Sequence, residues 1–182
     1  MANSRFTTFR DLVNNLHQHV PVHIPSPLEQ PRRAAVVAIL RWHCSRAQPS
    51  QKVPTSIQAF FDQNWVKEDK EGYAEILFMQ RTARAGDRWS GHVAFVGGKN
   101  EQGESDRDTA KREVLEEIGI DLNDTSVFLP VGKLNEREIS SIKDDKLLMI
   151  LVPFVYLQIV PESPSFQLQA SEVAAVQCKD TL

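Results

Sequence analysis

The sequence has little of several features that mark well-defined classes of protein. It contains only two cysteines, Cys44 and Cys178, which lie far apart and form no CxxC pair. This usage excludes a disulfide scaffold and a zinc ribbon, and it is typical of a reduced intracellular protein. No apolar run approaches the roughly 20 residues that span a bilayer, and the N-terminus has no hydrophobic signal core. We therefore expect a soluble protein of the cytoplasm or of an organelle, with mitochondrion and peroxisome both left open.

An excess of positive charge is also missing. The formal net charge is −3 and the sequence pI is about 6.0, so binding to nucleic acid or to a membrane surface is disfavoured. We expect a small-molecule partner instead. With 182 residues, 41% of them hydrophobic, the chain has enough apolar material for one globular domain.

The first 31 residues differ in pattern from the rest. Apolar residues between positions 6 and 20 have helical spacing, and prolines then interrupt residues 21–31. We assign 1–31 to an amphipathic helix and a Pro-rich linker, and 32–182 to the main domain. The irregular spacing of His17, His19 and His23 beside prolines indicates a surface segment rather than a metal cluster.

The main domain alternates strand-like runs with less regular segments. Residues 43–72 are polar and irregular, and we interpret them as a loop insertion with a brief helix from Thr55 or Ser56 through Trp65. Pro153 suggests a kink or an edge position in the last predicted strand. Apolar and β-branched content predicts strands at 34–40, 73–80, 93–95 and 146–160.

One helix is clearly delimited, over residues 105–118. Ser105 followed by Asp108 is typical of a capping box, and Gly119 stands where a glycine ends a helix. Apolar residues occupy one face, and a second face carries three carboxylates at i, i+3 and i+4, namely Glu113, Glu116 and Glu117. Neighbouring like charges repel by roughly 0.2–0.5 kcal/mol per pair. A divalent cation would offset this repulsion, because carboxylate oxygens are ligands that Mg²⁺ and Mn²⁺ prefer.

The surroundings of these carboxylates resemble a known motif. The pattern G-x5-E-x7-R-E-U-x-E-E-x-G-U, with U an aliphatic residue, is complete from Gly98 to Ile120 and resembles the Nudix box. Gly97 and Gly98 let the backbone approach an ion and phosphates closely, and Arg112 can orient the carboxylates while pairing with Glu104. The resemblance implies an α/β Nudix fold, an α/β/α sandwich with a mixed sheet.

The same resemblance implies a Mg²⁺- or Mn²⁺-dependent hydrolase of nucleoside diphosphate derivatives. It makes Glu113 and Glu117 the primary metal ligands, with Glu116 and the Gly98 carbonyl assisting. Two residues remain open as the base that takes the proton of the attacking water. One is Glu113, and the other is Glu172, which resembles an acid that many members supply from outside the box.

Residues 77–98 resemble in part the signature of coenzyme A diphosphatases, L-L-T-x-R-S/A-x3-R-x3-G-x3-F-P-G-G. Gly91, Phe95, Gly97 and Gly98 keep its spacing, whereas Arg81 meets the first arginine only with one inserted residue. Thr82 and Val96 depart from the signature, and Arg84 and Arg88 lie near its second arginine. This resemblance implies that Arg81, Arg84 and Arg88 bind the phosphates of coenzyme A or an acyl derivative, together with Gly97 and Gly98. Arg84 and Arg88 as solvated loop charges are the competing interpretation.

Two alternatives stay open at this point. The chain could hydrolyse another nucleoside diphosphate derivative, or it could be a non-catalytic, truncated Nudix-fold binding protein. Members of the family usually continue through a strand and a terminal helix, and that C-terminal helix is apparently missing here. We therefore expect an exposed apolar face that makes the chain unstable, oligomeric or inactive.

Overall fold

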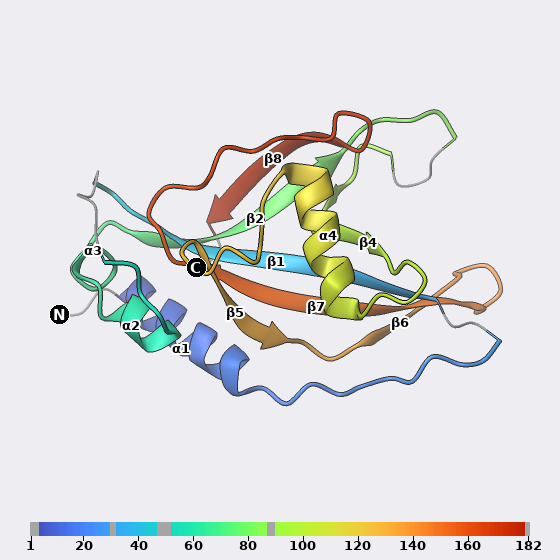
Figure 1. The fold of residues 1–182 in the computed structure, drawn as a ribbon, viewed down its shortest axis with the longest axis horizontal. Coiled ribbons are helices and arrows are strands. Elements are labelled where there is room, and N and C mark those ends of the chain that lie inside the picture. Colours follow the sequence, from blue (N-terminus) through green and yellow to red (C-terminus); the bar gives the residue numbers. More distant parts are fainter. Residues whose placement is uncertain (1–3, 30–31, 47–51, 87–89, 181–182) are drawn as a thin grey trace.

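The computed structural model describes residues 4–29, 32–46, 52–86 and 90–180. These residues form one eight-stranded mixed sheet with helices packed on both faces (Figure 1). The predicted α/β fold with a mixed sheet is therefore confirmed. In chain order the elements are α1 (Ser4–Gln18), β1 (Arg33–His43), α2 (Ile57–Phe61), α3 (Asn64–Lys67), β2 (Tyr73–Arg81), β3 (Val93–Ala94), β4 (Val96–Lys99), α4 (Asp106–Ile118), β5 (Phe128–Lys133), β6 (Arg137–Ser140), β7 (Leu147–Gln158) and β8 (Val173–Asp180).

The sheet is organised around β1. Its main path runs β3-β2-β1-β7-β5, while β4 pairs with β1, β6 with β7 and β8 with β2. The β1–β7 pair is parallel and the other pairs are antiparallel. On one side β1 pairs with β2 through Leu40 and Ile76, and with β4 through Ala35 and Gly98. This division of one strand edge between two partners places the paired glycines of β4 beneath α4.

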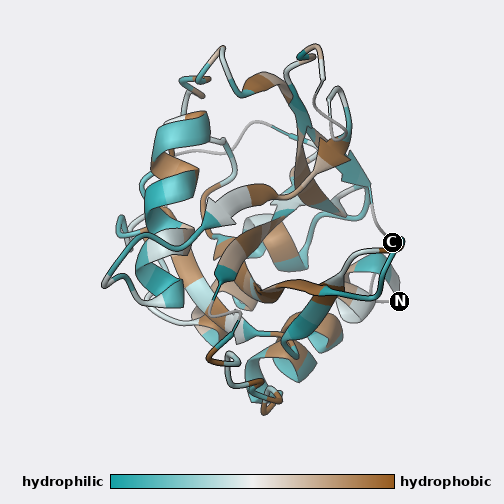
Figure 2. Cartoon of the chain, turned by 90° about the vertical axis from the view of Figure 1, so that its right-hand side faces the viewer, coloured by the Kyte–Doolittle hydropathy of each residue, from teal (hydrophilic) through white to brown (hydrophobic). Residues whose placement is uncertain are grey.

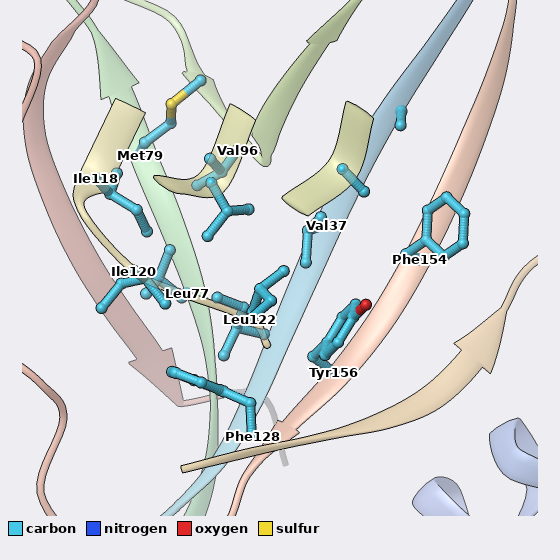
Figure 3. Close-up of a cluster of buried hydrophobic side chains, with 14 of the residues drawn as sticks. Val37, Leu77, Met79, Val96, Ile118, Ile120, Leu122, Phe128, Phe154 and Tyr156 are labelled. Atoms are coloured by element: carbon cyan, nitrogen blue, oxygen red, sulfur yellow. The ribbon is translucent and has the colours of Figure 1, made fainter. Parts of the chain in front are cut away.

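Alternation along the strands builds two hydrophobic cores, one on each face of the sheet. On β1, Val37 and Ile39 face the first core and Leu40 and Trp42 face the second. The first core lies between the sheet and α4 (Figure 3). Hydrophobic residues accordingly concentrate on the strands between the helices, and the outward face of α4 is hydrophilic (Figure 2).

The second core corrects our interpretation of residues 43–72. Ser56 does cap a short helix, accepting a hydrogen bond from the Ala59 amide at 3.1 Å. This segment is not a loop insertion, however, because it buries five apolar side chains of α2 and α3. They belong to one cluster with Phe6, Phe9 and Val13 of α1, and the five are Ile57, Phe60, Phe61, Trp65 and Val66. The predicted amphipathic helix at the N-terminus is thus confirmed as a helix that covers the sheet.

The position of Pro153 in β7 decides whether this strand lies at an edge of the sheet, as the sequence suggested it could. The strand is interior, because β1 flanks it on one side and β5 and β6 on the other. The edge position is therefore wrong. The Pro153 carbonyl accepts a hydrogen bond from the Leu134 amide at 3.0 Å, and Leu134 lies between β5 and β6. Since the N–H and C=O of a strand residue point the same way, the missing N–H faces this junction, where it disrupts neither ladder.

Four strands were not predicted from the sequence: β4, β5, β6 and β8. After β7, the described chain forms a loop and then β8, which pairs with β2 and packs Val176 and Cys178 against the first core. None of the described helices is long and apolar enough to cross a membrane.

Candidate active site

Helix α4 positions the acidic cluster, and its ends are fixed as the sequence predicted. The Ser105 side chain accepts a hydrogen bond from the Asp108 amide at 3.2 Å. Gly119 ends the helix in the left-handed region with φ of 74°. Ala110, Val114 and Ile118 are fully buried in the first core. This anchored face fixes the direction in which the three glutamates of α4 point.

Two of these glutamates lie against the glycine pair of β4. The Gly97 amide donates a hydrogen bond to Glu117 Oε2 at 3.0 Å, and the Glu117 side chain is only 3% exposed. Gly97 has φ of 150°, and a Cβ there would lie 2.1 Å from the Ala35 carbonyl oxygen. A Cβ on Gly98 would lie 2.3 Å from Glu113 Oε1. Only glycines therefore allow β4 to pair with β1 while both carboxylates approach its backbone.

The electrostatics of these two carboxylates is unfavourable without a cation. Burial raises the pKa of Glu117 to about 7, even though the Gly97 hydrogen bond lowers it. Burial also raises the pKa of Glu113, although Arg112 opposes the shift. The negative charge of Glu172 raises both values further, whereas the positive charge of Arg81 lowers that of Glu117. A buried acid and a partly buried acid, both with raised pKa values, form an environment that a positive ion would stabilise.

Arg112 organises the outer side of the cluster. Its Nε and Nη2 donate to both oxygens of Glu104, at 2.7 and 3.1 Å. Its Nη1 donates to Glu113 and to Glu116, each at 2.9 Å. The guanidinium group lowers the pKa of Glu104 to about 2. Arg112 and Glu104 are thus brought together as predicted, and Glu116, 57% exposed in its side chain, lies on the solvent side.

Glu172 approaches from a different part of the chain, immediately before β8. Its side chain is 45% exposed, and Arg84 Nη2 lies 3.9 Å from its Oε1. Arg84 also donates a hydrogen bond to the Ser171 carbonyl. The structure therefore engages Arg84 with the loop that carries Glu172. Arg88 lies outside the described residues.

The carboxylates of this cluster are the donors available to a metal ion. Among the described residues, no three His, Cys, Asp or Glu side chains converge so as to hold an ion in their present conformation. In this conformation Arg112 donates hydrogen bonds to Glu113 and Glu116. The chemistry of the donors nevertheless fits a hard divalent cation, since Glu113 and Glu117 are carboxylates whose burial is incompletely compensated.

A second charged cluster, which sequence reasoning missed, supports the start of α4. Arg33 donates to Asp106 at 2.9 Å and pairs with the buried Glu136 at 2.7 Å. Asn100, just after β4, donates to the same Asp106 at 2.8 Å. No sequence signal marked Glu136, because its role depends on tertiary contacts with β1 and with the segment after α1.

Comparisons with known proteins agree with this geometry. The model of the NUDIX domain matches residues 64–178, which is more than half of the chain. An uncharacterized protein of Schizosaccharomyces pombe is 38% identical over 153 residues, which are 84% of this chain and 42% of that protein. The chain thus spans less than half the length of this curated relative.

Among solved structures, the crystal structure of a MutT/nudix family protein from Enterococcus faecalis superposes with a TM-score of 0.50 and 15% identity. It covers 97% of this chain and 50% of that one. At this identity the likeness shows the fold alone. The family rests on the domain match over residues 64–178, within which the whole sequence motif from Gly98 to Ile120 lies. The chain belongs to the NUDIX domain family.

Proposed function

We propose that the chain is a hydrolase that cleaves the diphosphate bond of a nucleotide-containing small molecule with the help of Mg²⁺ or Mn²⁺. The observation that carries this proposal is the pair Glu113 and Glu117. Glu117 is buried and Glu113 is partly buried against the glycines of β4, and both have raised pKa values. A protein that needed these residues only for stability would gain from apolar replacements.

In this proposal Glu113 and Glu117 are the primary ligands of the ion, and Glu116 and the Gly98 carbonyl assist. Arg112 contacts one oxygen of Glu116, which leaves the other oxygen to assist. When bound, the ion supplies charge stabilisation to the diphosphate and lowers the pKa of a coordinated water. Arg112 is held by both oxygens of Glu104, and it would keep Glu113 oriented towards the bound ion.

We assign the proton transfer from the attacking water to Glu172. Glu113 is the other candidate, but it is bonded by Arg112 and is needed as a ligand. Glu172 is half exposed, comes from a separate element and is close enough for its charge to act on both ligands. These properties suit a general base that contacts the water rather than the ion.

The proposed substrate is coenzyme A or an acyl derivative, which would yield 3′,5′-ADP and 4′-phosphopantetheine or its acyl form. Its support is the partial signature in residues 77–98 and the position of Arg81, whose charge acts on Glu117. One observation favours a second candidate, another nucleoside diphosphate derivative. Arg84 is engaged by Ser171 and Glu172, so it is less suited to hold an additional 3′-phosphate.

The test is hydrolysis across a panel of coenzyme A, an acyl-CoA, ADP-ribose, a dinucleoside polyphosphate and a nucleoside triphosphate, with Mg²⁺ and with a chelator. We expect cleavage that depends on the metal and is fastest with the coenzyme A compounds. Glu138→Gln, at an exposed position on β6, is the matched control and should retain activity. Cleavage of another diphosphate would overturn only the substrate. No cleavage of any compound would favour a binding protein.

A further inference from the structure

Hydrogen bonds hold the last residues of the loop before β8, 167–172, to the end of α4 and to the end of β2. On one side, the amides of Gln167 and Gln169 donate to the Ile118 and Glu117 carbonyls at the end of α4, each at 2.9 Å. The loop accordingly passes the C-terminal end of α4 (Figure 1). The Gln169 carbonyl then accepts from the Glu172 amide at 2.7 Å, which closes a turn. This turn brings Glu172 near the acidic cluster.

On the other side, Thr82 holds the loop from the end of β2. Its amide donates to the Glu172 carbonyl at 2.8 Å, and its hydroxyl donates to the Ala170 carbonyl at 2.9 Å. Thr82 therefore binds the backbone on both sides of Ser171. Its hydroxyl is the part of this anchor that a substitution can remove without changing the backbone.

The anchor lies next to a bulge in β8. Gln80 pairs with Ala175 and Arg81 pairs with Val173, so Ala174 has no opposite residue on β2. The bulge brings Val173 onto the face that already holds Val176 and Cys178 in the first core. Bulges redirect side chains beside active sites, but they interrupt the ladder and leave the following backbone less constrained. The two Thr82 hydrogen bonds follow directly after this interruption.

We propose that Thr82 is a positioning residue, whose hydroxyl fixes the Ala170–Glu172 backbone and thereby sets the Glu172 carboxylate against Glu113 and Glu117. This inference rests on the proposed function, in which Glu172 takes a proton from the attacking water. Thr82 touches neither substrate nor ion in this role. Its effect should therefore appear in kcat, and the binding of substrate should change little.

The experiment is a double-mutant cycle with Thr82→Val and Glu172→Gln, in which valine keeps the shape of threonine and removes the hydroxyl. We expect Thr82→Val to lower kcat about threefold to tenfold, or ~0.7–1.4 kcal/mol in activation free energy, with KM unchanged. Thr82→Ser should restore most of kcat. In the Glu172→Gln background, Thr82→Val should have less than about a twofold effect, because the group that it positions is gone.

Thr8→Val is the matched control, since the Thr8 hydroxyl also donates to a backbone carbonyl at 2.9 Å, on α1 and away from the site. It should leave kcat unchanged. Amide hydrogen exchange of residues 168–175 should rise in Thr82→Val and stay unchanged in Thr8→Val.

The possible failures are distinguishable. An equal loss of kcat in both backgrounds, or no loss at all while Glu172→Gln is slow, overturns the role of Thr82 alone. Full activity of Glu172→Gln overturns the assignment of the base and the Thr82 inference with it. A wild-type chain that cleaves no diphosphate overturns the proposed function itself.

Discussion

Two clusters of carboxylates with an arginine lie at α4, and they differ in how completely the charge of their buried glutamate is compensated. At the start of the helix, the buried Glu136 receives hydrogen bonds from Arg33, from His23 and from the Ile24 amide. Burial raises its pKa, but these bonds outweigh burial and bring it to about 2. Near the other end of the helix, Glu117 accepts a hydrogen bond from the Gly97 amide, but burial raises its pKa to about 7.

In the proposed function, this difference separates a carboxylate that stabilises the fold from one that binds an ion. A carboxylate whose partners are complete stabilises the fold and has no affinity left for a ligand. A buried carboxylate whose compensation is incomplete costs stability, and this cost is recovered when a cation binds. Identical residue types within one protein can thus be assigned opposite roles from burial and partners alone.

The largest expected effect is on catalysis, when the incompletely compensated Glu117 is replaced. Glu117→Gln should lower kcat by on the order of 10³-fold, because the loss of one ligand charge weakens an interaction that supplies several kcal/mol to the transition state. The melting temperature of the metal-free protein should stay the same or rise, because glutamine removes a buried charge without removing packing atoms. Steady-state kinetics in saturating Mg²⁺ and calorimetry measure the two effects. Normal turnover would exclude Glu117 as a ligand.

Replacing the compensated Glu136 by glutamine should have the opposite effects, which are a loss of stability and little change in activity. Glu136→Gln should lower the free energy of unfolding by about 3 kcal/mol, because it leaves Arg33 without one of its buried partners. Activity of the folded fraction should change little, since Asp106 still holds Arg33. Urea denaturation at neutral pH, beside the activity assay, tests this prediction.

The pH dependence of this variant gives a further check. The pKa of Glu136 is lower in the folded chain than its ordinary value of 4.5, so its contribution is complete above about pH 4.5 and is lost as the pH falls towards 2. The stability difference between wild type and Glu136→Gln should therefore shrink over this range. A difference that is constant with pH would show that the charge of Glu136 is not what stabilises the fold.

The sequence predicted the elements whose signals are local. The 105–118 helix has its cap, its apolar face and its terminal glycine within one segment, and β1, β2 and β7 are rich in apolar residues. It did not predict β4, because Gly97 and Gly98 have low strand propensity and pair only through the complementary edge of β1. Likewise, burial of residues 57–66 depends on α1, which is distant in the sequence.

For the candidate site too, the sequence predicted the parts whose signals are local and missed the contacts between distant segments. Residues of the continuous motif come together because one short strand, one helix and the loop between them carry them. The partners of Arg84 and the contacts of Thr82 with the loop before β8 join residues that are about 90 positions apart, and no periodicity reports such contacts.

The smallest expected effect concerns substrate choice, and it tests the role of Arg81. Arg81 is the cation whose charge lowers the pKa of Glu117, and a guanidinium there can also bind phosphate oxygens. If it holds the 3′-phosphate of coenzyme A, dephospho-coenzyme A should be the poorer substrate by about tenfold in kcat/KM, since one charge-assisted contact contributes ~1.5 kcal/mol or more. Arg81→Ala should then reduce this preference towards unity.

Because Arg81 also influences Glu117, the variant should slow the cleavage of both substrates, but the ratio of the two kcat/KM values cancels that shared effect. Glu138→Gln should leave the ratio unchanged. A ratio of one in the wild type, or an unaltered ratio in Arg81→Ala, would assign Arg81 to the electrostatics of the carboxylates instead of to recognition of the 3′-phosphate.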